Sequence, residues 1–328
     1  MASRLPAAAL LALAILAIAT VACRDRRGDE STASATSEAT STDGPPVDRP
    51  DPGASRGSMR LDGYTRGWRL YVPASLPEAG LVPLVIGLHG GLGSGEQFAA
   101  DARFDRQAER GAFIAVYPDG VARSGLIDAR TWNAGSCCGT AVSEGVDDVA
   151  FIEALLDRLV GELPLDEDRV YVTGHSNGAM MGYRLACELS DRIAAIAVVA
   201  GSLEAPCAPS EPVSILSIHG DADESHPLEG GNGPRAITNV DYNSVASSIA
   251  SWRDLDGCPG EPVVTEVGPV HAETWSSCAE HTEVSSIVVA GASHSWPGGA
   301  PTGPLRADPS SDLDASAAVW DFLSRQRR

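Results

Sequence analysis

The chain has 328 residues, a hydrophobic content of 43% and a formal net charge of −20. This length accommodates one large domain or two, and the negative charge makes nucleic acid a poor partner. The 24 lysine or arginine positions are all arginine, so mechanisms that need a lysine, such as a Schiff base, a P-loop or a Ser-Lys dyad, are excluded.

Residues 1–23 are typical of an export signal. Arg4 precedes an apolar run over residues 7–19 that is too short to span a bilayer comfortably. The segment Thr20-Val-Ala-Cys23 resembles the lipobox of bacterial lipoproteins, in which the cysteine becomes the lipidated N-terminus. We therefore expect residues 1–23 to be a signal peptide, Cys23 to carry a lipid, and the protein to be exported and anchored to a membrane. An ordinary cleaved signal is the alternative.

The following segment, residues 24–59, is predicted to be a flexible tether. It is rich in Ser, Thr, Pro and Asp and has almost no large apolar side chains, so it cannot bury enough surface to offset the entropy of ordering. The rest of the chain, residues 60–328, is predicted to form one α/β domain.

Seven apolar runs in that domain predict strands buried on both faces, because each run is continuous and rich in β-branched residues. They are residues 68–72, 81–88, 113–117, 170–173, 193–199, 213–218 and 284–290. Helical periods occur at residues 146–159, 179–190 and 315–323. Strands that alternate with helices indicate a mostly parallel sheet with helices on both faces.

The pattern Gly-x-Ser-x-Gly occurs at Ser55 and at Ser176. Ser55 lies in the predicted tether, where no base or oxyanion donor would be held beside it. Ser176 directly follows the predicted strand 170–173 and precedes a helical segment, and its small neighbours suit a sharp strand-to-helix turn. That turn would place the N–H of Asn177 at a helix start, where it can stabilise an oxyanion. Ser176 is therefore the predicted nucleophile.

A serine needs a base, and in the absence of lysine we expect a histidine. In strand-turn-helix enzymes of this kind the acid and then the histidine follow the serine. Four histidines come late enough, and His294 alone directly follows the last predicted core strand; the others are His226, His271 and His281. His294 is the predicted base.

The acid of the triad should follow a strand that lies between the serine and the histidine. Asp221 and Asp223 both follow the predicted strand 213–218. Either carboxylate could hold the imidazole in its working tautomer. Position alone does not choose between them.

Seven blocks, in order, resemble the secreted polyhydroxybutyrate depolymerase and feruloyl esterase group of α/β-hydrolases. They are Leu88-His-Gly-Gly91, Tyr117-Pro-Asp-Gly120, Trp132-Asn-Ala-Gly-Ser-Cys-Cys-Gly139, Val146-Asp-Asp-Val149, Arg169-Val-Tyr-Val-Thr-Gly-His-Ser-Asn-Gly178, Ile218-His-Gly-Asp-Ala-Asp223 and Gly291-Ala-Ser-His-Ser-Trp-Pro-Gly298. They cover essentially all of residues 60–328. The resemblance implies an α/β-hydrolase fold and a serine esterase that needs no cofactor and no metal.

The resemblance also implies roles for single residues. In that group the acid is the last residue of a His-Gly-Thr-x-Asp block, which implies Asp223, and Asp221 replaces the usual threonine. The second oxyanion donor is implied to be Gly91, with Gly90 as the alternative. Trp132 and Trp296 fall on loops of the active edge and are expected either to form an apolar substrate pocket or to pack elsewhere.

Six cysteines lie in the predicted domain, and an even number in an exported protein indicates disulfides. Their spacing does not fit a zinc site. We expect Cys258 to pair with Cys278 and Cys187 with Cys207. This leaves Cys137 and Cys138 as an adjacent pair, and an interleaved pairing is the alternative.

Together these features predict an exported, monomeric serine carboxylic ester hydrolase that forms an acyl-enzyme. The substrate classes implied by the resemblance are short-chain esters, feruloylated or acetylated polysaccharides, and hydroxyalkanoates. Two alternatives share the same sequence features. One is a catalytically silent binding lipoprotein on this fold, and the other is a peptidase or acyltransferase with the same triad.

Overall fold

The computed structural model describes residues 49–122, 129–300 and 309–328. The predicted signal peptide, Cys23 and the predicted tether up to residue 48 lie outside these ranges. In the part of the chain that the structure describes, no helix is both long enough and apolar enough to cross a bilayer.

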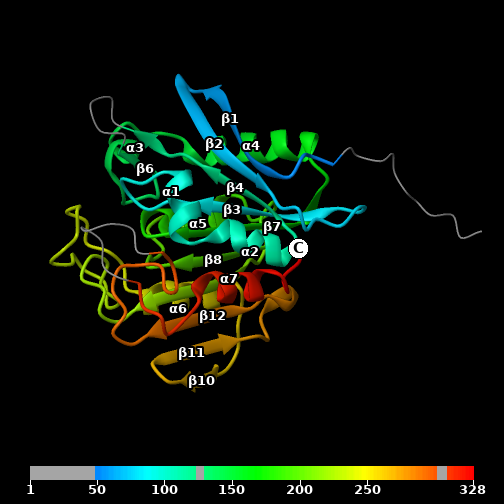
Figure 1. Cartoon of the computed structure of the whole chain (residues 1–328). Coiled ribbons are helices and arrows are strands. Elements are labelled where there is room, and N and C mark those ends of the chain that lie inside the picture. The colour runs from blue at the N-terminus through cyan, green and yellow to red at the C-terminus, as the bar shows by residue number, and fades with distance from the viewer. Residues whose placement is uncertain (1–48, 123–128, 301–308) are drawn as a thin grey trace, which may run out of the picture. The chain divides into compact units, whose positions relative to one another are not determined.

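Ten strands form one sheet in the order β1-β2-β4-β3-β7-β8-β9-β12-β11-β10 within the described residues (Figure 1). The six central strands are parallel: β4 (Ile114–Pro118), β3 (Val82–Leu88), β7 (Leu165–His175), β8 (Ala195–Val199), β9 (Ser214–Gly220) and β12 (Val284–Val289). The edges are antiparallel: β1 (Gly53–Leu61) and β2 (Tyr64–Val72) on one side, and β11 (Val270–Trp275) and β10 (Val263–Val267) on the other. A separate ribbon joins β5 (Val121–Ala122) to β6 (Arg130–Thr131).

Helices cover both faces of this sheet. Along β3, Leu84 and Ile86 belong to one hydrophobic cluster and Val85 to the other, as the alternation of a strand requires. The first cluster takes in α4 (Asp148–Glu162), α5 (Asn177–Glu188) and α6 (Val245–Leu255), and the second takes in α1 (Gly95–Asp101), α2 (Phe104–Gly111) and α7 (Ala315–Leu323). Two short elements complete the set, α3 (Gly139–Ser143) and the 3-10 turn η1 (Ala279–His281). The predicted α/β-hydrolase architecture is confirmed.

All seven predicted strands and all three predicted helices have counterparts in the structure, with boundaries that differ by a few residues. The predicted tether, by contrast, extends too far. Residues 53–59 belong to β1, which pairs along its whole length with β2. This edge strand is largely exposed and gains its order from ladder hydrogen bonds, so it shows no apolar run. Ser55 lies on its exposed surface opposite Leu70, outside the residues that line the main cavity.

Three disulfides join the six cysteines in the expected pairs. Cys187–Cys207 ties the end of α5 to the loop after β8, and Cys258–Cys278 ties the end of α6 to the turn after β11. Each closes a separation of 20 residues, which is worth about 3 kcal/mol in a chain-entropy estimate. Cys137 and Cys138 form a vicinal disulfide.

Asp256 is a buried carboxyl at the C-terminal end of α6. Its Oδ1 accepts a hydrogen bond from the backbone N–H of Val213, just before β9. Burial raises the pKa of this carboxyl to about 6, against the opposing effect of its hydrogen bonds. Because the native state then holds the proton more tightly than the unfolded chain, the contribution of Asp256 to the free energy of unfolding falls as pH rises from about 4 to 6.

We expect Asp256→Asn, which mimics the protonated carboxyl, to be more stable than the wild type above pH 6. The gain is up to about 3 kcal/mol, because two pKa units correspond to that difference, and it should vanish towards pH 4. Urea unfolding between pH 4 and 8 measures it. Asp254→Asn, an exposed position two residues earlier, is the matched control and should leave the curve unchanged. A constant difference between the Asp256 variant and the wild type at all pH values would contradict the assignment.

Candidate active site

A cavity of about 460 Å³ opens at the carboxyl ends of the parallel strands. Four loops contribute to its lining, those that follow β3, β7, β9 and β12. This is the edge at which ligands bind in parallel α/β sheets, because the loops there converge without crossing the sheet. The sequence-predicted site residues Gly91, Ser176, His294 and Trp296 all line it.

Ser176 occupies a sharp turn between β7 and α5. Its backbone has φ 56° and ψ −121°, a conformation that residues with a side chain rarely adopt, and its N–H donates to the carbonyl of Val199 at 2.9 Å. The flanking glycines make the turn possible. A Cβ on Gly174 would collide with the carbonyl oxygen of Gly178, and one on Gly178 would collide with that of Leu88. The Gly-x-Ser-x-Gly spacing is thus a steric requirement here.

Three side chains form a continuous hydrogen-bonded chain at the cavity. Nε2 of His294 lies 2.8 Å from Oγ of Ser176, and Nδ1 of His294 lies 2.6 Å from Oδ2 of Asp223. Because a carboxylate only accepts, Nδ1 carries the proton that bonds Asp223 and Nε2 presents a lone pair to the serine hydroxyl. The three residues are far apart in sequence and meet only through the fold.

Asp223 is fully buried and held from its other side as well. Its Oδ1 accepts from the backbone N–H groups of Ser225 and His226, each at 2.8 Å. Burial acts to raise the pKa of Asp223, but the hydrogen bond from His294, the favourable electrostatic interaction with that ring and the backbone hydrogen bond from His226 outweigh it, so the pKa lies below its usual value. The carboxylate is therefore ionised and oriented before any substrate arrives.

Asp221 has a different partner. It is exposed, and its Oδ1 accepts from the backbone N–H of Gly291 at 2.6 Å. It thereby ties the loop after β9 to the loop that carries His294. Of the two sequence candidates, the structure brings Asp223 to the imidazole.

Backbone donors flank Ser176. The N–H of Asn177 belongs to the first turn of α5, where no intrahelical acceptor exists. A Cβ added at Gly91 would lie 3.8 Å from Cβ of Asn177, and one added at Gly90 would lie 3.5 Å from Cβ of Ser176. The next amide along, that of Leu92, donates to the carbonyl of Arg130. Both glycines of the loop after β3 therefore lie beside the turn that carries Ser176.

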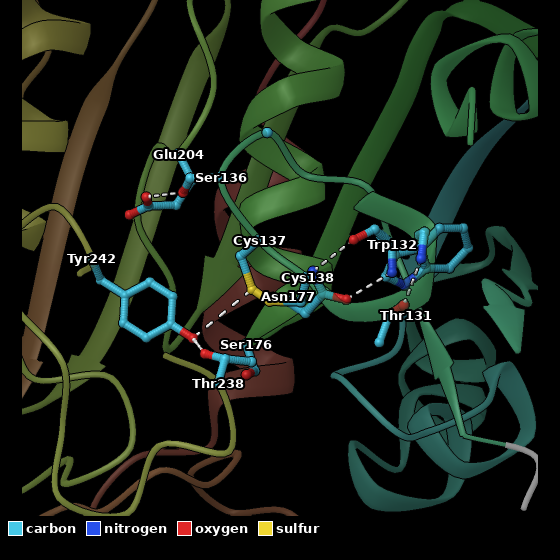
Figure 2. Close-up of a disulfide and its surroundings, with 12 residues drawn as sticks. Thr131, Trp132, Ser136, Cys137, Cys138, Ser176, Asn177, Glu204, Thr238 and Tyr242 are labelled. Carbon is cyan, nitrogen blue, oxygen red and sulfur yellow. Dashed lines mark hydrogen bonds between the residues drawn. A yellow bond between two sulfur atoms is a disulfide. The ribbon is translucent and has the colours of Figure 1, made fainter. Parts of the chain in front are cut away.

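Trp132 links these two parts of the site instead of lining the cavity. Its indole Nε1 donates to the carbonyl of His89 at 3.0 Å. Its backbone N–H donates to Oδ1 of Asn177 at 2.7 Å, and its carbonyl accepts from Nδ2 of Asn177 at 3.0 Å (Figure 2). The indole is fully buried, so the prediction of a pocket role for Trp132 is wrong and its packing alternative holds. Trp296 does line the cavity, and its indole N–H donates to Ser316.

The vicinal disulfide closes the loop that begins at Trp132 (Figure 2). The N–H of Cys138 donates to the carbonyl of Trp132 at 3.0 Å, and the N–H of Ala134 donates to the carbonyl of Cys137 at 2.7 Å. Sγ of Cys137 lies 3.8 Å from the hydroxyl of Tyr242, whose side chain lines the cavity. The disulfide loop thus supports both the turn that carries Ser176 and one cavity wall.

The segment between β9 and α6 contributes cavity residues that sequence reasoning missed. Among them are His226, Ile237 and Tyr242. The sequence offers His226 only as a candidate base, whereas in the structure its Nε2 lies 2.8 Å from Oγ of Ser202. Nothing in the periodicity of this segment indicated that it would reach the site. Among the described residues, no group of three or more His, Cys, Asp or Glu side chains is arranged to hold a metal ion.

The family model described as esterase PHB depolymerase matches residues 67–228. The chain is 32% identical over 257 residues to the predicted esterase NocK of Nocardia uniformis subsp. tsuyamanensis, and 72% of each chain is covered. It is 27% identical over 219 residues to feruloyl esterase B of Piromyces equi, which covers 65% of this chain but only 39% of that protein.

A solved structure, the acetyl xylan esterase from Aspergillus awamori, superposes with a TM-score of 0.53 at 16% identity and covers 74% of this chain and 94% of that one. At this identity the superposition shows the fold alone. The sequence relationships together with this fold place the protein among carboxylic ester hydrolases, and the chain belongs to the polyhydroxybutyrate depolymerase and feruloyl esterase-like group of α/β-hydrolases.

Proposed function

We propose that this protein is an exported serine esterase that cleaves its substrate through an acyl-enzyme on Ser176. The observation that carries the proposal is the unbroken hydrogen-bonded chain from Ser176 through His294 to Asp223 at the wall of the cavity. A serine hydroxyl is a weak nucleophile by itself, and this arrangement supplies the base and the group that orients the base.

In the acylation step, Oγ of Ser176 attacks the ester carbonyl while Nε2 of His294 takes the hydroxyl proton. The carbonyl oxygen becomes an oxyanion and accepts hydrogen bonds from the N–H groups of Asn177 and Gly91. The tetrahedral adduct then expels the alcohol, which leaves with the proton from His294. Asp223 remains ionised and stabilises the imidazolium that exists between the two transfers.

In the second step, a water molecule replaces the alcohol. His294 takes a proton from the water as its oxygen attacks the acyl carbonyl, and the same two N–H groups stabilise the second oxyanion. Collapse of this adduct returns the proton to Oγ of Ser176 and releases the carboxylic acid. No lysine or cofactor enters either step.

The substrate we propose is an ester with a small or aromatic acyl group, such as an acetyl, short-chain, hydroxyalkanoyl or feruloyl ester. The apolar side chains of Leu92 and Ile237 line the cavity and are 54% and 71% exposed, which suits contact with a partly apolar substrate. Two related proteins support this range, the feruloyl esterase B of Piromyces equi and the bifunctional acetylxylan esterase/xylanase XynS20E of Neocallimastix patriciarum.

The nucleophile is tested by labelling and by hydrolysis. A fluorophosphonate should label the wild type, and Ser176→Ala should lose both the label and all but a background of ester hydrolysis. Ser55→Ala, which alters the second Gly-x-Ser-x-Gly match, is the matched control and should keep both. The panel contains p-nitrophenyl acetate and butyrate, methyl ferulate, a hydroxybutyrate oligomer and a peptide amide. Absence of label in the wild type would indicate a binding protein, and preference for the amide would indicate a peptidase.

Substitution of Asp223 and substitution of Asp221 should have clearly different effects on kcat. Asp223→Asn is expected to lower kcat by about 10³- to 10⁴-fold, because an amide no longer fixes the tautomer of His294 or stabilises the imidazolium. Asp221→Asn keeps the oxygen that accepts from Gly291, so its kcat should stay within about threefold of the wild type. Steady-state kinetics on p-nitrophenyl acetate measure both. Equal losses in the two variants would show that Asp223 is not the acid of the triad.

We also propose that the protein is exported and anchored through a lipid on Cys23. The signal-like residues 1–23 and the three disulfides of the described domain support export, because disulfides persist in oxidising compartments. Labelled palmitate should enter the protein and the protein should sediment with membranes, and Cys23→Ser should abolish both. Ser34→Ala is the control in the same region. Release of wild-type protein into the medium without label would favour a simple cleaved signal.

A further inference from the structure

A buried ion pair contacts two of the loops that surround the site. The guanidinium of Arg66, on β2, bonds Oδ1 of Asp148, the first residue of α4, at 2.5 Å, and the two side chains are 3% and 0% exposed. The guanidinium also lies over the ring of Phe151, 3.9 Å from its centroid. Taking two charges out of water is costly, and an apolar pair of similar volume often stabilises a fold equally well. The other contacts of this pair are therefore the informative ones.

From Arg66, a chain of hydrogen bonds leads to the loop after β3. Nη2 of Arg66 donates to the carbonyl of Asp119 at 3.3 Å, and the N–H of the same peptide, that of Gly120, donates to Nε2 of His89 at 2.9 Å. A ring nitrogen that accepts a hydrogen bond is unprotonated, so the proton of the neutral ring is on Nδ1. Nδ1–H of His89 donates to the carbonyl of Gly90 at 2.8 Å. One peptide and one imidazole thus connect the buried cation to Gly90.

The last peptide of this chain carries the N–H of Gly91. Its carbonyl, that of Gly90, accepts from the ring of His89 and from the N–H of Gly93 at 3.1 Å, so the orientation of the peptide is fixed. The peptide is trans, and its N–H therefore points away from the carbonyl and from the ring of His89. Within the described part of the chain, the N–H of Gly91 donates to no other group. It is an oriented donor in the loop that lies beside Ser176.

A second chain of hydrogen bonds leads from Asp148 to the start of α5. Oδ2 of Asp148 accepts from the N–H of Asn133 at 2.7 Å. The carbonyl of the same peptide, that of Trp132, accepts from Nδ2 of Asn177, and the N–H of Trp132 donates to Oδ1 of Asn177 (Figure 2). The side chain of Asn177 is held at both of its polar atoms, so the position of its backbone N–H is held as well.

We propose that the Arg66–Asp148 ion pair positions both oxyanion donors, the N–H groups of Gly91 and Asn177. The inference rests on the proposed function, in which these two groups stabilise the oxyanion. Neither Arg66 nor Asp148 lines the cavity, so both are positioning residues that act through the two chains of hydrogen bonds. The chain from Arg66 also has an electrostatic consequence. Hydrogen bonds in series polarise one another, so a chain that starts at a buried cation strengthens the donor at its end.

Such positioning acts on the transition state more than on the bound ester. The carbonyl oxygen of the ester carries little charge, whereas the oxyanion carries a full one, so displaced donors lower kcat and leave KM nearly unchanged. A misplacement of about 1 Å costs on the order of 10²-fold in rate. A boronic acid tests the same geometry without turnover. Oγ of Ser176 adds to the boron while its proton goes to His294, and the tetrahedral anion places an oxygen where the oxyanion would lie.

The experiment replaces the whole pair with apolar side chains of similar volume, Arg66→Met together with Asp148→Leu. We expect this variant to fold, because no unpaired charge remains. Its kcat on p-nitrophenyl butyrate should fall by about 10²-fold, its KM should stay within about threefold, and its Ki for n-butylboronic acid should rise by about the factor lost from kcat. A merely structural role would not move Ki, because a smaller folded fraction lowers the maximal rate and leaves Ki and KM unchanged.

The matched control is the pair on the other face of β2. Arg69 bonds Asp105 at 2.6 Å, and Arg69→Met together with Asp105→Leu should keep kcat and Ki within about threefold of the wild type. Asp148→Asn carries the test should the double variant fail to fold. An amide has one oxygen and can accept from only one of Arg66 and Asn133, so Ki should rise by about tenfold.

The outcomes separate this inference from the proposed function. A folded double variant with unchanged Ki, whether or not its kcat falls, would overturn the positioning role and leave the esterase intact. Failure of both Asp148 variants to fold, with the control folded, would likewise assign the pair to stability alone. A wild type that neither binds the boronic acid nor is labelled by fluorophosphonate would overturn the proposed function and this inference with it.

Discussion

The strained backbone of Ser176 is the constraint around which the site is arranged. A serine with a positive φ between a strand and a helix is maintained only where its surroundings leave no alternative. Here the carbonyls of Leu88 and His89 lie so close to Gly178, and the carbonyl of Gly178 so close to Gly174, that neither glycine has room for a side chain. The turn therefore fixes β3 and β7 against each other at their carboxyl ends. This proximity also places the glycines after β3 beside Ser176, so one steric constraint positions both the proposed nucleophile and the proposed oxyanion donors.

Trp132 extends that constraint to a third segment. Its backbone bonds the side-chain amide of Asn177 and its indole bonds the carbonyl of His89, so the loop after β3, the start of α5 and the disulfide loop are held as one unit. Because the side-chain amide of Asn177 and the indole N–H of Trp132 both form hydrogen bonds inside the protein, neither is available to bind substrate. The bonds that keep Trp132 out of the cavity lining also hold the proposed oxyanion donors, in the loop after β3 and at the start of α5, at a fixed separation.

Much of the fold and of the candidate triad could be predicted from the sequence, because the signals for the strands and for the turn at Ser176 are local. Buried parallel strands are continuous apolar runs, and the glycines around Ser176 are adjacent to it in the chain. The choice between Asp221 and Asp223 was not local and needed the resemblance. The sequence did not predict the edge strand β1 or the packing role of Trp132, because each depends on a partner elsewhere in the chain. The partner of β1 is β2, and that of Trp132 is Asn177.

His294 and His226 show why residue type alone does not give function. Both lie against the turn that contains Asp223, yet their surroundings give them opposite tautomers. In His294, Nδ1–H donates to the carboxylate of Asp223 and Nε2 accepts from Ser176. In His226, Nε2–H donates to Ser202, because the hydroxyl proton of Ser202 goes to Glu204, and Nδ1 is unprotonated. The first arrangement suits proton transfer, because the lone pair faces a hydroxyl that must be deprotonated. The second suits a structural role, because a buried neutral ring with a lowered pKa keeps its hydrogen bond to Ser202 without taking up a further proton.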